Sequence, residues 1–272
     1  MLSFLISAIK IIFLLGFLVL IHEGGHFIVA KMCKVKVNEF AIGFGPTLIS
    51  KQKGETKYAL HLIPLGGFVS LEGEEERSDE EGSFSNTSIP KKIAIVLAGG
   101  LVNIIFGLLV YFILISSTAK IASNEVDYTV NNYYLGAVFK NTESTFADKI
   151  SYGLSNTKDF VLLIFDNLKE MFTGKISANQ MVGIVGISNI VVNTSGLYEY
   201  IYMLALISLS LGLTNLLPFP PLDGGKVVIY LVEAIRRKPM KEELEIKLQM
   251  LGFAILIALS IYVTYNDILR IV

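Results

Sequence analysis

Two histidines and a glutamate lie close together in an apolar stretch near the beginning of the chain, in the order His22-Glu23-Gly24-Gly25-His26. On a helix, residues four apart share one face, so both imidazoles can bind one metal ion. Glu23 lies beside them and is placed to take a proton from a water at that ion. Zinc suits two imidazole nitrogens, one carboxylate and an open water position. The alternative, a chance match of polar residues, is weakened because ionisable side chains within an apolar span are costly.

A catalytic zinc site needs a third protein ligand. The remaining histidine, His61, has leucine on both sides and is typical of an ordinary strand residue. Asp223 is the better candidate, because it follows a later apolar stretch in TNLLPFPPLDGGK, where Pro218, Pro220 and Pro221 prevent a continuous helix. Two interpretations stay open: Asp223 binds the ion, or it caps the helix that follows the prolines.

A second apolar stretch carries small and polar residues at helical spacing, namely Gly99, Gly100, Asn103 and Gly107. Small residues allow two membrane helices to approach closely, and an asparagine within the membrane needs a hydrogen-bond partner. The pattern indicates a packing interface, a catalytic role for Asn103, or both.

Membrane helices must position these residues. Hydrophobic residues make up 53% of the 272 residues, charged residues make up 17%, and the mean hydropathy is +0.60. Because about 20 apolar residues cross the hydrocarbon, the sequence predicts spans at 5–29, 93–115, 201–217 and 251–263, the last of them short. The first is too long for a signal peptide and lacks an early basic region. The predicted fold class is a mainly α, polytopic membrane protein with about four transmembrane helices.

The charge distribution predicts an orientation. The formal net charge is −1, so no global field favours nucleic acid, and the single cysteine excludes an intramolecular disulfide. Lysines and arginines concentrate between the first two spans and between the last two. The positive-inside rule then places these loops in the cytoplasm, and both termini and residues 120–198 outside. Asp223 therefore has the same expected depth as His22 and His26, towards the cytoplasmic side, which favours the ligand interpretation.

The loops contain smaller elements. The segment TKYALHLIPLGGFVSLEGE predicts a β-hairpin with a turn at residues 64–67 and a second strand at residues 68–71. This hairpin either dips into the membrane from the cytoplasmic side or forms a small soluble subdomain. Residues 72–83 are acidic and predict a solvated loop, and residues 156–173 predict an interfacial helix, preceded by an irregular stretch at 121–150.

Three motifs in this order resemble the site-2 protease family of intramembrane zinc metalloproteases: HEGGH in the first span, AGGLVN in the second and NLLPFPPLDGG after the third. The stretches VNEFAIGFGPTLIS, IPLGGFVSLEGE and FSNTSIPKKIAIVLAGG are similar to the bacterial branch typified by the regulator of sigma-E protease (RseP). The resemblance implies that His22, His26 and Asp223 bind Zn²⁺ and that Glu23 is the general base.

Further residues receive roles from the same resemblance. Asn103, and with it Asn215, would help to position the substrate or the transition state. The family's membrane-embedded hairpin would map to residues 58–71, whose exposed strand edge could hold an unwound substrate by strand addition. The substrate-binding residues of that edge would be Gly67, Phe68, Val69 and Ser70.

The expected organisation is two catalytic halves, residues 1–119 and 199–272, flanking a short extracytoplasmic region at 120–198. The first half contains the hairpin region 36–73 and the acidic loop 72–83. Members of this branch usually carry a PDZ domain between the second and third spans, but only about thirty residues remain there, too few for such a core. We therefore expect no PDZ domain. The prolines that the family often carries in AGGLVN and GIVG are also absent.

The sequence thus predicts an intramembrane zinc metalloprotease of the bacterial plasma membrane. Its expected substrates are single-span membrane proteins, such as anti-sigma factors, or remnant signal peptides, and its expected surroundings are the lipid bilayer without nucleic acid. Two alternatives remain, a membrane metal-binding or transport protein without hydrolysis and an inactive scaffold relative. The intact Glu23 argues against the scaffold, because loss of that residue is the simplest route to inactivity.

Overall fold

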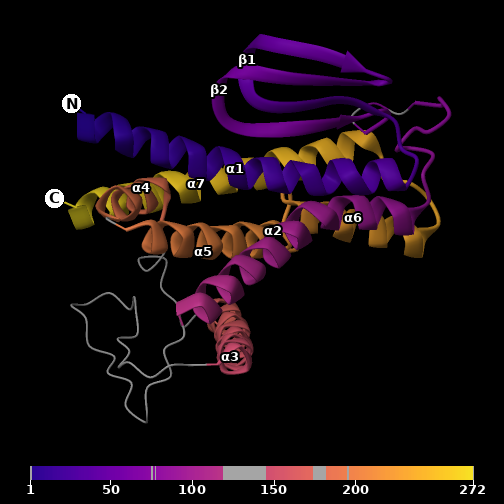
Figure 1. Ribbon diagram of the computed structural model, residues 1–272. Helices are drawn as coiled ribbons and strands as arrows, with labels where there is room; N and C mark the ends of the chain where they lie inside the picture. The colour runs from indigo at the N-terminus through magenta and orange to yellow at the C-terminus, as the bar shows by residue number, and fades with distance from the viewer. Residues whose placement is uncertain are drawn as a thin grey trace.

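The computed structural model consists of long helices, with a folded-over sheet lying along one of them (Figure 1). The structure describes residues 2–74, 76, 78–118, 145–173, 182–194 and 196–271. The elements are α1 (Leu2–Met32), β1 (Val37–Lys53), β2 (Thr56–Leu71), α2 (Ile89–Thr118), α3 (Phe146–Phe172), α4 (Ile184–Asn193), α5 (Leu197–Asn215), α6 (Asp223–Arg236) and α7 (Glu242–Ile271). The predicted fold class, mainly α with a small sheet, is confirmed.

Four helices of the described part are long and apolar enough to cross a membrane: Ile6–Met32, Ile89–Ser117, Leu197–Asn215 and Glu242–Arg270. They correspond to the four predicted spans, and the chain is a multi-pass membrane protein. The last span, predicted at 251–263, is much longer in the structure. Its flanking residues include Glu, Lys, Leu and Gln, which are good helix formers and continue the helix although several of them are polar.

Glycines bring the backbones of α2 and α5 into close contact. A Cβ atom on Gly212 would lie 2.5 Å from the carbonyl oxygen of Gly100, and one on Gly107 would lie 2.8 Å from a backbone oxygen of α5. Ser208 on α5 donates a hydrogen bond of 2.8 Å to the backbone carbonyl of Asn103 on α2. The small-residue face of the second span is therefore a packing interface, and it holds Asn103 in a fixed place.

Each strand of the sheet bends back, so that the sheet is folded over itself. Residues 37–42 of β1 pair on one side with residues 67–71 of β2 and on the other side with residues 57–60. Residues 47–53 of β1 pair with residues 56–61. Residues 67–71 therefore form one edge of the sheet, here called the inner edge, and residues 47–53 form the outer edge.

The predicted hairpin turn at residues 64–67 is wrong. The turn between the two strands lies at Gly54 and Glu55, and residues 64–67 lie within β2. The prediction assumed that residues 68–71 pair with the preceding residues of β2. They pair instead with the first part of β1. The Pro-Leu-Gly-Gly segment instead bends a single strand, and Gly66 supports this bend with φ of +120°.

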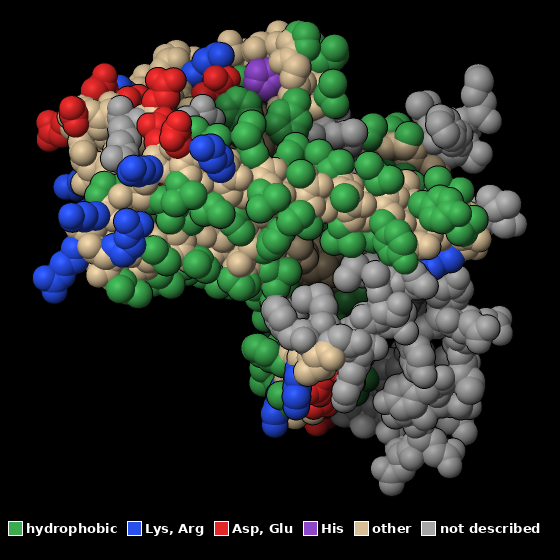
Figure 2. Space-filling view, turned by 180° about the vertical axis from the view of Figure 1, so that it is seen from behind, with side chains coloured by type: hydrophobic (Ala, Val, Ile, Leu, Met, Phe, Trp, Pro, Cys, Tyr) green, Lys and Arg blue, Asp and Glu red, His purple; other side chains and the backbone are tan. Residues whose placement is uncertain are grey.

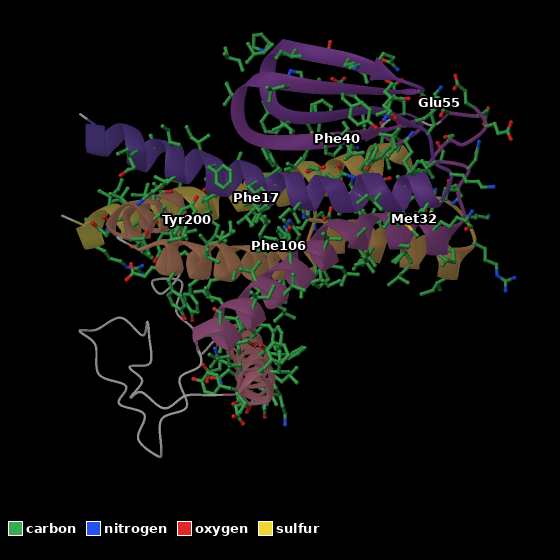
Figure 3. All side chains as sticks on the ribbon, viewed as in Figure 1. Phe17, Met32, Phe40, Glu55, Phe106 and Tyr200 are labelled. Atoms are coloured by element: carbon green, nitrogen blue, oxygen red, sulfur yellow. The ribbon has the colours of Figure 1, made fainter. Side chains whose placement is uncertain are left out.

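The sheet lies along the C-terminal half of α1 (Figure 3). Phe40 packs against Phe27 of α1 with ring centroids 5.1 Å apart, while Phe17 of α1 packs against Phe106 of α2 at 5.7 Å. Glu55, in the turn, lies at the same end as Met32 (Figure 3). The bends at the opposite end of the sheet carry exposed apolar side chains, namely Phe44, Leu48, Ile49, Leu62 and Ile63. An apolar end beside a membrane-length helix favours the membrane-associated interpretation over a soluble subdomain.

The helix predicted at residues 156–173 is found as α3, which begins earlier, at Phe146. It runs across the direction of the spans at one end of α2, as expected of a helix lying on a bilayer surface (Figure 1). Tyr111 of α2 and Phe160 of α3 stack with ring centroids 4.4 Å apart. The rest of the outer region, residues 119–144 and 174–181, lies outside the described residues.

The short helix α4 is held at both ends by charged side chains of neighbouring spans. Asp267 of α7, which is only 1% exposed, accepts hydrogen bonds from the N–H groups of Gly183 and Gly186 at 2.9 and 2.8 Å. Lys10 of α1 donates a hydrogen bond to the carbonyl oxygen of Thr194 at 3.2 Å. Each charge complements the helix dipole at its end, so α4 connects the first span to the last.

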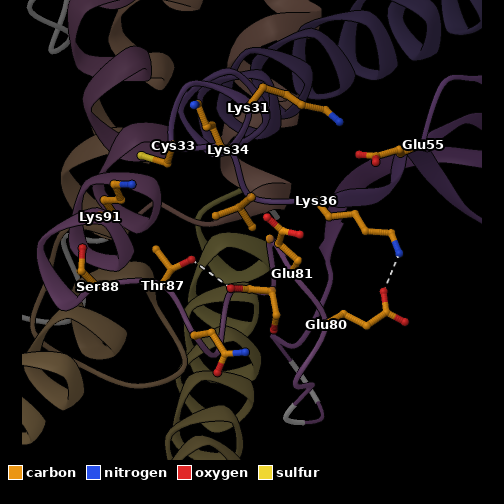
Figure 4. Close-up of a pocket in the computed structure, with 14 residues that line it drawn as sticks. Lys31, Cys33, Lys34, Lys36, Glu55, Glu80, Glu81, Thr87, Ser88 and Lys91 are labelled. Atoms are coloured by element: carbon orange, nitrogen blue, oxygen red, sulfur yellow. Dashed lines mark hydrogen bonds and ion pairs between the residues drawn. The ribbon is translucent and has the colours of Figure 1, made fainter.

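Charged side chains gather at one end of the molecule, whereas hydrophobic side chains cover a broad band over the helices (Figure 2). At the junction of α1 and α2 there is a hollow of about 960 Å³ lined by lysines and glutamates (Figure 4). Lys36 pairs there with Glu80 at 2.8 Å. Lys31 and Lys91 also line the hollow, while none of the three predicted metal ligands does. This hollow is therefore separate from the predicted metal site.

Candidate metal centre

α1 presents both histidines of the HEGGH motif on one face. The Nε2 atoms of His22 and His26 lie 3.2 Å apart. The same two atoms lie 3.3 and 3.4 Å from Oδ2 of Asp223, the first residue of α6. The structure therefore brings the three predicted ligands together, although Asp223 is far away in the sequence.

These three donor atoms fit a zinc ion. In a tetrahedron, zinc bonds of about 2.0–2.1 Å place neighbouring donor atoms about 3.3–3.4 Å apart, and the three observed separations lie between 3.2 and 3.4 Å. Oδ2 of Asp223 is buried and has no hydrogen-bond partner among the described residues. A zinc ion between these three donor atoms would offset the cost of burying them together. The geometry and the donor chemistry thus agree with the zinc-ligand prediction.

The loop before α6 gives Asp223 its position. The helix is preceded by Leu222 in an extended conformation, and no side chain caps the helix. A Cβ atom on Gly224 would lie 2.3 Å from the carbonyl oxygen of Leu216, and one on Gly225 would lie 2.5 Å from the nitrogen of Pro220. Only glycine allows the backbone to pack this closely against the preceding loop. The interpretation of Asp223 as a helix cap is not supported by any capping hydrogen bond among the described residues.

Glycines also shape the space around the imidazoles. A Cβ atom on Gly99 of α2 would lie 2.3 Å from Nε2 of His26 and 2.8 Å from Cε1 of His22. One on Gly25 would lie 2.6 Å from the carbonyl oxygen of Ala98. Gly25 thus lets α2 approach α1, and Gly99 leaves the room that the metal-binding edges of the two imidazoles require.

Both imidazoles are held from behind. Nδ1 of His26 lies 2.8 Å from the carbonyl oxygen of Ile95, to which it donates a hydrogen bond. Nδ1 of His22 lies 3.4 Å from the side-chain amide of Asn103, which is fully buried. Nε2 of each ring faces Asp223. The predicted catalytic role of Asn103 stays a prediction, but its side chain contacts the side of His22 that faces away from Asp223.

The inner edge of the sheet lies against Glu23. A Cβ atom on Gly67 would lie 3.4 Å from Cγ of Glu23 and 3.5 Å from Cγ1 of Val19. Phe68, Val69 and Ser70 continue this edge and pair with residues 39–41 of β1. The predicted general base and the predicted substrate-binding strand are therefore neighbours.

Two other residues considered from the sequence are not among the three candidate ligands. His61 is a buried residue of β2 whose Nδ1 lies 3.3 Å from Oγ1 of Thr47, and its ring stacks on Phe68 at 6.0 Å. It is the ordinary strand residue that the sequence indicated. Asn215 is the last residue of α5 and lies at the start of the loop that leads to Asp223, and its role stays a prediction.

Sequence reasoning missed an ion pair beside the site. Lys226 lies one helical turn after Asp223, and its Nζ contacts Oε1 of Glu74 at 2.7 Å. Burial lowers the pKa of Lys226, but the Glu74 carboxylate more than offsets this, so that the net pKa is raised and the ammonium stays charged. The pair ties the end of β2 to the helix that carries Asp223. The lysine that directly follows LDGG in the sequence was the available signal, but its partner could not be found without the fold.

Comparison with known proteins identifies the family of this chain. Residues 10–259 match the model of peptidase family M50. A protein of Clostridium acetobutylicum with the provisional name zinc metalloprotease is 30% identical over 93% of this chain and 94% of its own length. A protein of the same provisional name from Clostridium perfringens is 30% identical over 93% of this chain and 95% of its own length, and one from Campylobacter jejuni is 27% identical over 98% and 94%.

The matched region includes most of α1 with its HEGGH motif, the sheet, α2 and the loop with Asp223. The alignment with the Clostridium acetobutylicum protein spans 320 positions, more than this chain contains, so that relative has residues without a counterpart here. The chain belongs to peptidase family M50, the site-2 protease family, and is a metallopeptidase of the membrane.

Proposed function

We propose that this protein is a zinc-dependent endopeptidase that cleaves single-span membrane proteins within or near their transmembrane segments. The observation that carries the proposal is the triangle of His22, His26 and Asp223, with donor separations of 3.2–3.4 Å and with Glu23 beside it. The names of the relatives support zinc as the metal. Anti-sigma factors and remnant signal peptides are the substrate types that we propose.

His22, His26 and Asp223 would hold the ion, and the bound zinc would activate a water and polarise the peptide carbonyl. Glu23 would take a proton from the attacking water and deliver it to the leaving nitrogen. Its contact with the inner edge of the sheet supports this role, because a peptide on that edge would run past its carboxylate. The burial of the three ligand side chains, which are 11–19% exposed, keeps the charges of the site poorly screened.

The substrate would have to unwind locally, because the carbonyl groups of an intact transmembrane helix are hydrogen-bonded. No strand among the described residues pairs with the outward side of the inner edge, where the N–H and C=O groups of Gly67–Leu71 could bind an extended peptide by strand addition. Backbone recognition of this kind accepts many side chains. It suits an enzyme that acts on varied transmembrane sequences.

We also propose an orientation in the bacterial plasma membrane. Both termini and residues 120–198 would be extracytoplasmic, and the metal centre would lie towards the cytoplasmic side. The support is the gathering of lysines and arginines at one end of the molecule, the end at which α1 finishes (Figures 1 and 2). The exposed apolar bends of the sheet would then contact lipid at membrane depth.

The test uses the full chain in detergent or liposomes with a panel of fluorescently tagged single-span peptides. The wild type should contain about one zinc per chain and cleave at least one peptide, and a zinc chelator should abolish cleavage. Glu23→Gln should keep the zinc and lose at least about 10²-fold in kcat. Zinc at equimolar content with metal flux across liposomes, but with no cleavage and no effect of Glu23→Gln, would establish the transport alternative instead.

A further inference from the structure

The two metal-facing imidazoles differ in how the back of each ring is held. A neutral histidine that offers Nε2 to a metal carries its proton on Nδ1, and that proton needs an acceptor. His26 has one, the carbonyl oxygen of Ile95 at 2.8 Å. At Nδ1 of His22, the contact is the side-chain amide of Asn103 at 3.4 Å.

The orientation of this amide decides whether His22 can bind. With its nitrogen towards His22, Asn103 places a donor against the Nδ1–H donor of a metal-binding ring. Its Oδ1 atom is then buried without a hydrogen-bond partner among the described residues. Turning the amide by half a turn about its last side-chain bond resolves both conflicts, because Oδ1 then accepts the hydrogen bond from Nδ1–H.

The backbone of Asn103 is held firmly enough for this task. The residue is 0% exposed, and Ser208 of α5 donates a hydrogen bond of 2.8 Å to its carbonyl oxygen. One turn later, Gly107 brings α2 against the backbone of α5. The backbone of Asn103 is therefore fixed, and its buried side-chain amide has little freedom to turn towards a substrate.

We propose that Asn103 is a positioning residue whose Oδ1 accepts the Nδ1–H of His22 and so fixes the tautomer and ring orientation that bind the metal. In this role Asn103 acts through His22 and does not touch the substrate. The inference deepens the proposed function and rests on its zinc site. It assigns to Asn103 the task that the Ile95 carbonyl performs for His26.

The experiment measures zinc affinity without substrate, by competition with a chromophoric chelator. Asn103→Leu keeps a similar size but has no acceptor, and it should weaken zinc binding by about 10- to 100-fold. Asn103→Asp keeps an acceptor, and its affinity should stay within about threefold of the wild type. At saturating zinc, the activity of Asn103→Leu should largely return, because the chemical groups at the metal are unchanged.

Ser208→Ala is the matched control, because it removes the contact to the Asn103 backbone and leaves the amide in place. Because Gly107 still holds α2 against α5, zinc affinity in Ser208→Ala should fall less than in Asn103→Leu. Size-exclusion and thermal-unfolding profiles should show that all variants fold. Wild-type zinc affinity in Asn103→Leu, with a low kcat at every zinc concentration, would overturn the proposal in favour of a substrate contact. An absence of zinc binding by the wild type would instead overturn the proposed function itself.

Discussion

The metal centre and the inner edge of the sheet lie against each other, but they are built from different parts of the polypeptide. At the metal centre, His22, His26 and Asp223 would bind zinc through side-chain atoms that lie 3.2–3.4 Å apart. At the inner edge, Gly67–Leu71 would bind a substrate, as proposed above, through backbone N–H and C=O groups, of which only proline lacks one. The chemistry of the first region therefore restricts residue type, and that of the second restricts only backbone path.

Glycine shows the same difference. At the metal centre, Gly25 and Gly99 allow two helices and two imidazoles to approach more closely than a Cβ atom would permit. In the sheet, Gly43, Gly45 and Gly66 have positive φ values and serve the bends of the strands. Close approach is required at one region and an unusual backbone conformation at the other, so substitutions in the two regions should fail in different ways.

The largest effect should come from removing the ligand that the fold brings in from a distance. Asp223→Ala leaves two imidazoles at the site, so we expect zinc content to fall well below one per chain and cleavage to become undetectable. Zinc counted by atomic emission, together with cleavage of a tagged single-span peptide, checks this. Near-equimolar, tightly bound zinc in Asp223→Ala would contradict the assignment, and Glu23→Gln is the matched control because it should keep its zinc.

The metal centre depends on particular side chains and the inner edge on backbone path, so the sequence predicts the two regions to different extents. HEGGH and the Asp223 loop could be found because metal chemistry needs particular side chains, and the expected membrane depth brought them together. Lys226 and Glu74 could not be found as a pair, because an ion pair can join any two charged residues and only the fold sets their 2.7 Å contact. The membrane spans were predictable from apolar length, although hydropathy alone made the last one too short.

The sheet was predicted less well. Alternation and a Pro-Leu-Gly-Gly segment are equally consistent with a turn between two strands and with a bend within one strand. The difference depends on whether residues 68–71 pair with β2 or with β1, which is a tertiary choice that local sequence does not contain. The sequence therefore identified the residues of the inner edge. The strand with which they pair, and their contact with Glu23, could be found only from the structure.

Two neighbouring glycines of α1 allow a test of close approach at the metal centre, and substituting them should change stability moderately. A Cβ atom on Gly25 would lie 2.6 Å from the Ala98 carbonyl oxygen, whereas one on Gly24 would meet nothing within 4 Å. Gly25→Ala should therefore destabilise the fold by about 1–3 kcal/mol through overpacking. It should also weaken zinc binding, because the displaced backbone of α2 leads directly to Gly99.

Gly24→Ala is the control one residue away. Alanine is favoured over glycine in a helix by about 0.5–1 kcal/mol, so this variant should be as stable as the wild type or slightly more stable. Thermal unfolding in detergent and chelator competition measure both quantities. Equal destabilisation by the two substitutions would show that helix propensity, and not the contact with α2, governs this turn of α1.

The smallest effect should come from single backbone groups of the sheet. Consecutive N–H groups of a strand point to opposite sides, so Phe68→Pro and Val69→Pro together remove one group that faces β1 and one that faces outward. The variant that loses the outward group should keep its zinc and lower kcat/KM by about two- to tenfold, which is what one backbone hydrogen bond is worth. Cleavage of the tagged peptide and zinc content are measured in parallel.

The outer edge of the same sheet supplies the matched control. Ile49→Pro and Ser50→Pro each replace a residue of the outer edge, 47–53. Within the described part of the chain, this edge pairs with β2 on one side only and lies across the sheet from Glu23. One of the two outer-edge prolines should remove an N–H group that points away from the sheet. That group takes part neither in the hydrogen bonds between the strands nor in binding the peptide. If the inner edge holds the substrate, this variant should keep kcat/KM within about twofold of the wild type. Equal losses at both edges would mean that prolines act only by weakening the sheet. Unchanged kcat/KM in both inner-edge variants would mean that the substrate does not bind by strand addition, while the metal centre would remain as described.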